Sequence, residues 1–324
     1  MFWASYCLAA LALVLAWPVP IALSRAKWPA RSPFTAMVLW QAIALAGGLS
    51  MIGAMLTWGL EPIGDNLVSA LHGLWNILLY GAPATTLGLV HVFALSAALL
   101  LTIHLVFTLL LTYYRIRRGR RRHRGMLTLL SSPSDSRPAT VVINHPTPVA
   151  YCLPGGARSV TVLSDGLLEM LSDDELSAVL IHEKAHLSQR HHLLLWAFAA
   201  WRAALPWLPT SQLAQQSVNE LIEMLADDEA LREVEPETLI RAVAIVGTGA
   251  QPAEDGLQRA AAKAQGASLL ANPDEQEQLG TVRRLSRLLT PLPPLPGWQR
   301  WAVLMASVLL LAVPTVLLIA PGML

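Results

Sequence analysis

Four stretches of the chain are apolar over a length that can cross the hydrocarbon core of a membrane, which takes about 20 residues. They cover residues 2–23, 36–58, 89–112 and 301–320. Charged residues make up only 14% of the chain, whereas soluble domains carry about 25%. This composition excludes a plain soluble globule, a disordered chain and a protein that coats nucleic acid. The sequence therefore predicts an α-helical membrane protein with four transmembrane helices and one soluble part.

The first stretch is interpreted as a retained anchor rather than a secretory signal. No lysine or arginine precedes its apolar run, as the positively charged start of a signal peptide requires. Pro18 and Pro20 are expected to kink or end this helix, because proline lacks the N–H that a helix needs.

The placement of lysine and arginine predicts the orientation of the chain in a plasma membrane. Arg25, Lys27 and Arg31 follow the first stretch, and the connection over residues 60–86 carries no lysine or arginine. Seven arginines follow the third stretch: Arg115, Arg117, Arg118, Arg120, Arg121, Arg122 and Arg124. We expect the N-terminus outside, residues 115–300 in the cytosol and the C-terminus outside. The arginine run is interpreted as an anchor beside anionic lipid headgroups, not as a nucleic-acid site.

Two features of the membrane part leave alternatives open. Leucines at helical spacing in the outer connection predict a short amphipathic helix, which either senses a ligand or serves as a packed connector. These leucines are Leu67, Leu71, Leu74 and Leu78. His91 and His104 lie within the third stretch, where an ionisable group either has a function or bonds to a neighbouring helix.

The soluble part begins with β-rich segments and continues with helical patterns. Residues 140–143, 149–153 and 159–163 predict a small sheet of three strands. Ser172 and Glu175 form a capping-box sequence that starts a long helix. Further helices are expected to include 219–232 and 281–289, with a mobile polar segment over 251–276. The predicted domains are 1–114 with three transmembrane helices, 115–124 as a basic cytosolic anchor, 125–297 as the soluble domain and 298–324 as the fourth helix.

The motif that carries chemistry is His-Glu-x-x-His, formed by His182, Glu183 and His186 within the capped helix. Histidines four positions apart share one helix face, so both rings can bind one zinc ion. Glu183 is then placed to accept a proton from water on the ion. In the later helix, Glu223 is the candidate third ligand, and Asp227 could accept the free N–H of a ligating histidine.

Other polar residues near these helices receive no chemical role. Glu220, Asp228 and Glu229 are interpreted as a solvated face. His191 and His192 are interpreted as solvated or packing residues in preference to substrate-binding ones.

The strands before the motif offer an edge to which an extended peptide substrate can pair through backbone hydrogen bonds. This edge is formed either by 149–153, which includes Tyr151, Cys152 and Leu153, or by 159–163. Cys152 is disfavoured as a nucleophile because only His145 lies near it in the sequence.

Four segments, 150–155, 171–176, 182–186 and 223–227, together look like those of membrane-embedded gluzincin metallopeptidases. Within that group the chain resembles the BlaR/MecR-type sensor-transducer peptidases, which have three spans, a cytosolic protease domain and a fourth span. The resemblance implies an α+β gluzincin domain, with one Zn²⁺ held by His182, His186 and Glu223 and with Glu183 as the catalytic base. It also implies cleavage of a cytosolic transcriptional repressor, or activation of that cleavage, in response to a signal from outside.

The chain departs from the antibiotic-sensing members of that group at its end. Those members continue into an extracellular penicillin-binding domain, whereas this sequence stops at Leu324, so we expect a short form without that sensor. The expected partners are membrane lipid, a winged-helix repressor as substrate and a second copy of the chain, with no direct contact to nucleic acid. The alternatives are a general quality-control peptidase for membrane proteins and a non-catalytic receptor on a metallopeptidase scaffold. The intact Glu183 argues against the receptor.

Overall fold

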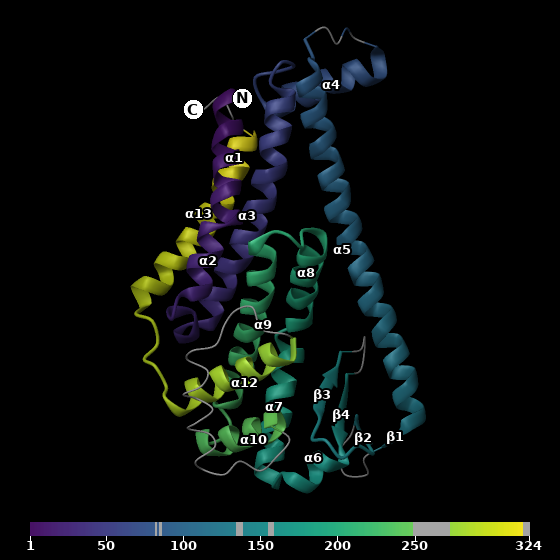
Figure 1. Ribbon diagram of the computed structural model, residues 1–324, viewed down its shortest axis with the longest axis vertical. Helices are drawn as coiled ribbons and strands as arrows, with labels where there is room; N and C mark the ends of the chain where they lie inside the picture. The colour runs from purple at the N-terminus through teal and green to yellow at the C-terminus, as the bar shows by residue number, and fades with distance from the viewer. Residues whose placement is uncertain (82, 84–85, 134–138, 155–158, 249–272, 320–324) are drawn as a thin grey trace. The chain divides into compact units, whose positions relative to one another are not determined.

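The computed structural model of the chain describes residues 1–81, 83, 86–133, 139–154, 159–248 and 273–319 (Figure 1). It contains two compact units, which are described separately. The spanning unit comprises Met1–Tyr113, Ala197–Val218 and Leu295–Leu324. The site unit comprises Tyr114–Trp196 and Asn219–Pro294. Three helices contribute residues to both units: α5 (Leu89–Leu130), α8 (His191–Ala204) and α9 (Pro209–Ala230).

The remaining helices of the spanning unit are α1 (Phe2–Ala16), α2 (Pro18–Arg25), η1 (Trp28–Arg31), α3 (Pro33–Leu60), α4 (Leu67–Tyr80) and α13 (Gly297–Ile319). Four segments are long and apolar enough to cross a membrane: Phe2–Arg25, Pro33–Leu60, Leu89–Leu127 and Gly297–Ile319. They confirm the four predicted stretches and indicate a multi-pass membrane protein. The expected outer amphipathic helix is present as α4, and the sidedness of the chain stays a prediction.

Helix α3 packs against both α1 and α13 in the spanning unit. Small residues line its buried face, and a Cβ atom added to Gly53 would lie 3.0 Å from Leu318 and 3.3 Å from Leu8. Glycine therefore allows the three helices to approach closely, as small residues do between helices in lipid.

The break between α1 and α2 falls where the prolines predict it. Helix α1 ends at Ala16 and α2 starts at Pro18. The hydroxyl of Thr210, at the start of α9, is buried and lies 2.7 Å from the carbonyl oxygens of both Leu15 and Ala16. A side chain from far along the sequence thus satisfies carbonyl groups that the interrupted helix leaves open.

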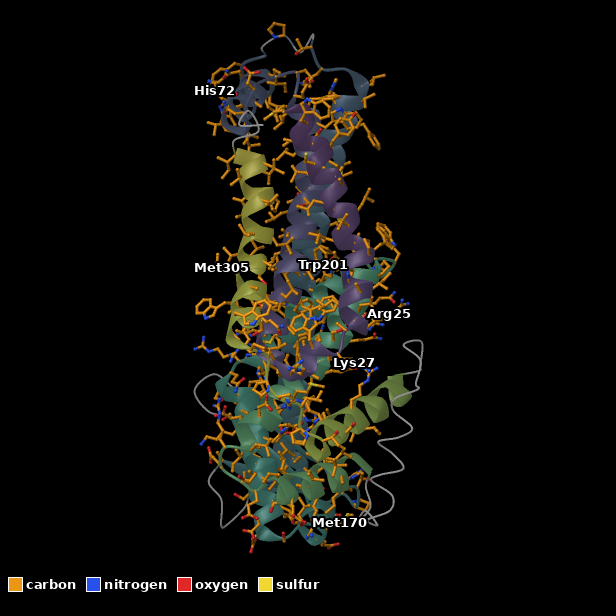
Figure 2. The ribbon with its side chains drawn as sticks, turned by 90° about the vertical axis from the view of Figure 1, so that its left-hand side faces the viewer. Arg25, Lys27, His72, Met170, Trp201 and Met305 are labelled. Carbon is orange, nitrogen blue, oxygen red and sulfur yellow. The ribbon has the colours of Figure 1, made fainter. Side chains whose placement is uncertain are left out.

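Residues 197–218 belong with the spanning helices, although the predicted domain limits place them inside 125–297. Trp201 of α8, labelled in Figure 2, lies against α3, where a Cβ atom added to Gly48 would be 3.1 Å from the indole ring. Ala204, Leu205 and Leu208 form a buried cluster with Ala16. The compact units therefore have limits that differ from those of the predicted domains.

The site unit contains a four-stranded sheet in the order β1-β2-β4-β3. Its strands are β1 (Ser131–Pro133), β2 (Thr140–Ile143), β3 (Ala150–Leu153) and β4 (Val160–Ser164). β4 pairs in parallel with β2 and antiparallel with β3, whereas β1 is antiparallel to β2. The three predicted strands are confirmed and β1 is additional. Because β4 is paired on both sides, the alternative that 159–163 forms a free edge is wrong, and β3 is one of the two edge strands.

Helices α6 (Asp165–Met170), α7 (Asp173–Ser188), α10 (Pro236–Thr248) and α12 (Pro273–Leu289) complete the site unit. The main core contains residues from β4, α6, α7, α10 and α12, among them Leu163, Leu176, Leu239 and Leu285. The sequence reading predicted neither α8 nor α10, and α12 begins earlier than the predicted helix. Most of the polar segment predicted over 251–276 lies outside the described residues.

Candidate metal and catalytic site

Helix α7 carries the His-Glu-x-x-His motif, and its start is fixed by the predicted capping box. The N–H of Ser172 donates to Glu175 Oε2 at 2.9 Å, and the N–H of Glu175 donates to Ser172 Oγ at 3.4 Å. The helix buries Leu176, Val179 and His182 on one face. The same packing that stabilises α7 therefore turns the first histidine of the motif inward.

Glu223 of α9 lies beside the two histidines of α7. His182 Nε2 is 3.3 Å from Glu223 Oε2 and 3.3 Å from His186 Nε2, and His186 Nε2 is 3.5 Å from Glu223 Oε1. Ligands about 2.0–2.1 Å from a zinc ion, at the corners of a tetrahedron, lie roughly 3.3 Å from one another. The separations of these three groups therefore fit one tetrahedral zinc ion, with the fourth corner left for water or substrate.

Asp227 lies one turn after Glu223 and is 1% exposed. Its Oδ1 is 3.0 Å from His182 Nδ1, as the sequence analysis predicted for a carboxylate behind a ligating histidine. A second partner was not predicted: Arg284 of α12 donates to both carboxylate oxygens of Asp227, at 2.7 and 2.9 Å. Arg284 also lies 2.9 Å from Glu223 Oε2.

Arg284 belongs to a row of arginines on α12 that faces a row of carboxylates on α9. Arg283 pairs with Glu220 and Arg287 pairs with Asp228, each at 2.7 Å. Glu220 and Asp228 therefore link α9 to α12 through ion pairs, while their side chains stay partly exposed, at 31% and 33%.

Glu183 faces the site from α7 and is fixed by β3. The backbone N–H of Cys152 donates to Glu183 Oε2 at 3.1 Å. Burial raises the pKa of Glu183 above its usual range, although the nearby His182 acts in the opposite direction. A carboxylate with a raised pKa suits a group that must accept and later release a proton near neutral pH.

The other groups of the site are strongly shifted in the metal-free protein. Burial lowers the pKa of His182, but hydrogen bonds to Asp227 and Glu223 outweigh it and raise that pKa to about 9. Burial raises the pKa of Glu223, yet His182 and Arg284 lower it to about 2. Burial lowers the pKa of His186 to about 4. Such opposed shifts within one cluster are typical of functional sites.

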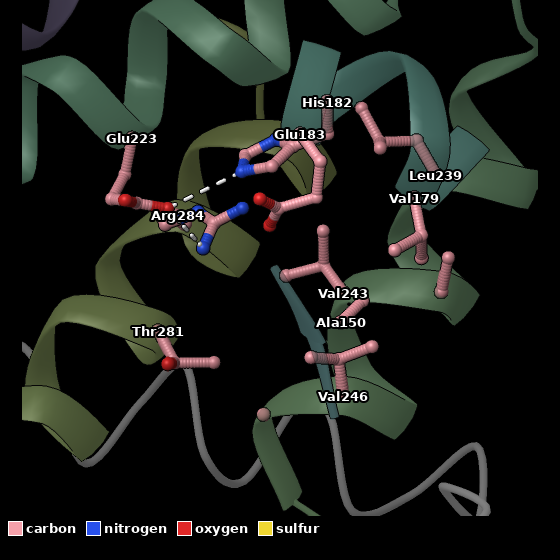
Figure 3. Close-up of a pocket in the computed structure, with 12 residues that line it drawn as sticks. Ala150, Val179, His182, Glu183, Glu223, Leu239, Val243, Val246, Thr281 and Arg284 are labelled. Carbon is pink, nitrogen blue, oxygen red and sulfur yellow. Dashed lines mark ion pairs between the residues drawn. The ribbon is translucent and has the colours of Figure 1, made fainter. Parts of the chain in front are cut away.

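A pocket opens from these groups toward α10 (Figure 3). His182, Glu183, Glu223 and Arg284 line its polar end. Its apolar lining comes from β3, α7 and α10: Ala150, Val179, Leu239, Ala242, Val243 and Val246. Two of the three candidate ligands, His182 and Glu223, thus share one cavity with the candidate base, and this cavity has an apolar wall.

The remaining predicted residues lie as follows. Tyr151 bonds to the end of α5, with its hydroxyl 2.7 Å from His123 Nε2, and Leu153 O accepts from Arg124 at 3.5 Å. Of the predicted substrate strand, Cys152 therefore makes a direct contact to the His-Glu-x-x-His motif. In the spanning unit, His104 Nε2 donates to the carbonyl oxygen of Ala204 at 3.0 Å, which favours a packing role for this histidine.

Sequence reasoning missed two contributions to the site. Arg284 could have been found from the matched spacing of arginines on 281–289 and of carboxylates on 219–232. The other is His191, which is 1% exposed and contacts His186. No sequence signal distinguishes His191 from His192, because their roles depend on the turn between α7 and α8.

Comparison with known protein families finds a match for part of the chain. Residues 92–234 match the family model of Peptidase family M48. The match covers less than half of the chain and includes the motif on α7 together with Glu223 and Asp227. The searches of curated proteins and of solved structures found no match.

Proposed function

We propose that this protein is a membrane-embedded, zinc-dependent endopeptidase. The observation that carries the proposal is the convergence of His182, His186 and Glu223 at tetrahedral separations, with Glu183 lining the same pocket as His182 and Glu223. A structural zinc site has no use for an adjacent base, so Glu183 favours catalysis over a receptor role. The similarity of residues 92–234 to Peptidase family M48 supports the same conclusion.

A zinc ion bound by these three residues would supply Lewis acidity toward a peptide carbonyl and acidify water beside it. Glu183 accepts a proton from the attacking water and delivers it to the leaving amine. Arg284 and Asp227 keep Glu223 and His182 in their ligating positions.

The substrate lies as an extended strand along the outer edge of β3, where the N–H of Cys152 now bonds to Glu183. Backbone hydrogen bonds of this kind tolerate many side chains, so the apolar end of the pocket and membrane tethering supply selectivity. We propose that the site unit faces the cytosol, in agreement with the placement of arginines after the third span.

We further propose that cleavage transmits a signal by removing a cytosolic repressor, or by triggering its removal. The BlaR/MecR-type arrangement of spans around a single soluble part supports this substrate class. The competing function is general quality control, in which many membrane proteins are cleaved.

The test compares cells that carry the native protein with cells that carry Glu183→Gln. Purified full-length protein should contain about one zinc per chain in both forms, and only the native form should cleave. Quantitative proteomics should then show one repressor-like protein accumulating in the variant cells. Accumulation of many membrane proteins would favour quality control, and equal cleavage by both forms would contradict the peptidase proposal.

A further inference from the structure

His191, the first residue of α8, is buried directly against a candidate metal ligand. Its Nδ1 lies 3.1 Å from His186 Nδ1, and the two rings meet edge to face at 77°. On its other side, His191 Nε2 is 2.9 Å from Gln189 Oε1. The imidazole thus bridges His186 and Gln189.

A left-handed turn between α7 and α8 places His191 there. Helix α7 ends at Ser188, the N–H of Gln189 bonds to Ala185 O, and Arg190 has a φ of +52°. This conformation is uncommon for a residue with a side chain, and it separates α7 from α8, which begins beside His186. The position of His191 is therefore fixed by the backbone, and its neighbour His192 lies outside the contact.

The hydrogen bonds run from His186 through His191 and Gln189 to Glu229, and the Glu229 carboxylate determines which atom donates in each of them. Gln189 Nε2 donates to Glu229 Oε2 at 3.5 Å, and an ionised carboxylate can only accept. Gln189 therefore presents its oxygen to His191, so His191 Nε2 must donate the proton in that bond. In a neutral ring this leaves His191 Nδ1 as an acceptor, and His186 Nδ1 becomes the donor to it.

The protonation of His186 Nδ1 determines which nitrogen of that ring can bind a metal ion. With its proton on Nδ1, His186 has a free lone pair on Nε2, which faces His182 Nε2 at 3.3 Å and Glu223 Oε1 at 3.5 Å. We propose that His191 and Gln189 are positioning residues that fix the tautomer and ring orientation of His186 for metal binding. His182 receives the same support directly from Asp227, whereas His186 receives it through two side chains that end at Glu229.

This inference rests on the zinc site of the proposed function, and it is tested by metal affinity rather than by activity. The zinc Kd of full-length protein is measured by competition with a chromophoric chelator, and the visible spectrum of the cobalt-substituted protein reports the ligand geometry. Loss of an outer hydrogen-bond partner typically weakens metal binding by about 10–100-fold. We expect this weakening in His191→Leu, a similar one in Asp227→Asn, and a smaller one in Gln189→Leu.

Two further variants separate a hydrogen-bonding role from a packing role. His191→Asn keeps an acceptor oxygen near the position of Nδ1 and should bind zinc far more tightly than His191→Leu. His192→Leu removes the adjacent imidazole and should leave the Kd and the cobalt spectrum unchanged. If His191→Asn is as weak as His191→Leu, or if His191→Leu binds like the native protein, the inference is wrong. If His191→Leu does not fold, His191→Asn and Gln189→Leu still decide it.

The proposed function fails by a different result. Suppose that the zinc Kd changes in the variants as expected, but the native protein shows no hydrolysis that depends on Glu183. This result would contradict the peptidase proposal and leave the positioning role intact.

Discussion

The two units satisfy their buried polar groups in different ways. In the spanning unit, neutral hydroxyl groups donate to main-chain carbonyl oxygens at 2.7–2.8 Å, and the donors include Thr57, Thr102, Thr210 and Ser307. In the site unit, charged side chains bond to each other, as Arg284 does with Asp227 and Arg287 with Asp228.

The difference is the one expected between a unit that crosses lipid and a unit that lies in water. Within lipid no water can complete a hydrogen bond, and a charge is costly, so neutral donors to the backbone are the economical solution. Outside the lipid, charges are tolerated when they are paired, and a cluster of pairs can exchange one partner for a metal ion. The paired charges beside the candidate metal ligands thus lie in the site unit.

The largest expected effect comes from removing a ligand in the site unit. His182→Ala, His186→Ala and Glu223→Ala should each lower the zinc content of the purified protein from about one per chain to near zero. Metal analysis by mass spectrometry measures this, with Glu183→Gln as the control that keeps its zinc. Full zinc content in Glu223→Ala would remove Glu223 from the ligand set.

The second-largest effect is expected when a buried ion pair of the metal-free site unit is broken. Arg284→Met leaves the buried carboxylate of Asp227 without its bidentate partner, and breaking a buried pair costs about 3–5 kcal/mol. Unfolding of the metal-free protein in detergent should show this loss, and zinc should reduce it. The control is Arg232→Met, which removes a surface pair with Glu229 and should cost about 1 kcal/mol or less. Equal losses in both variants would contradict the comparison between the units.

Proton binding should produce a smaller effect, confined to the site unit. The lowered pKa of Glu223, about 2, stabilises the fold above the unfolded pKa near 4.5 and is lost as the pH falls through 2. The pKa of His186, about 4, means that its neutral ring costs stability below about pH 6.5, where the unfolded ring is protonated. The pKa of His182, about 9, gives stability that is present below pH 6.5 and lost as the pH rises through 9.

The metal-free protein should therefore be most stable near pH 6.5, and thermal unfolding across pH 4–9 measures this. The zinc-loaded protein should not show the decline above pH 6.5, because ligation requires neutral histidines. A flat profile of the metal-free protein between pH 6.5 and 9 would contradict the pairing of His182 with Asp227.

The smallest effect is expected in the spanning unit. Thr210→Val removes the hydroxyl that bonds to Leu15 and Ala16, and a lost hydrogen bond of this kind costs about 1–2 kcal/mol. The change in unfolding temperature in detergent should be independent of pH between 4 and 9. Thr315→Val is the matched control, because Thr315 is exposed and bonds only within its own helix, to Leu311. A loss that varied with pH would contradict the neutral character of this unit.

The sequence predicts those parts of the molecule whose signals are local. Helix α7 is an example, because Ser172 and Glu175 start it and the two histidines of the motif are spaced by the helix itself. The strands β2, β3 and β4 are likewise visible as β-rich segments between turns. Strand β1 was missed because Ser131–Pro133 has neither apolar alternation nor β-branched residues.

The parts that could not be predicted depend on contacts across the fold. Arg284 enters the site from α12, which packs against α10, and it bonds to Asp227 of α9, more than fifty residues away in sequence. His191 bonds to His186 because the left-handed turn at Arg190 places the start of α8 there, and the sequence does not show which of the two adjacent histidines makes this contact. The assignment of 197–218 to the spanning unit depends on Thr210 and Trp201, whose partners lie on α1 and α3. The periodicity of apolar residues does not reveal such partners, because it indicates which face of a helix is buried and not which element packs against that face.

The contact of Thr210 with α1 also bears on the order in which the protein is made. Thr210 lies 195 residues after Leu15, so at about 5–20 residues per second its codon is read roughly 10–40 s after that of its partner. The carbonyl groups of Leu15 and Ala16 consequently wait for a segment that is made much later before they are hydrogen-bonded. By then α7, with both histidines and Glu183, has already been synthesised. The hydrogen bonding of α1 is therefore completed only after the residues of α7 have been made.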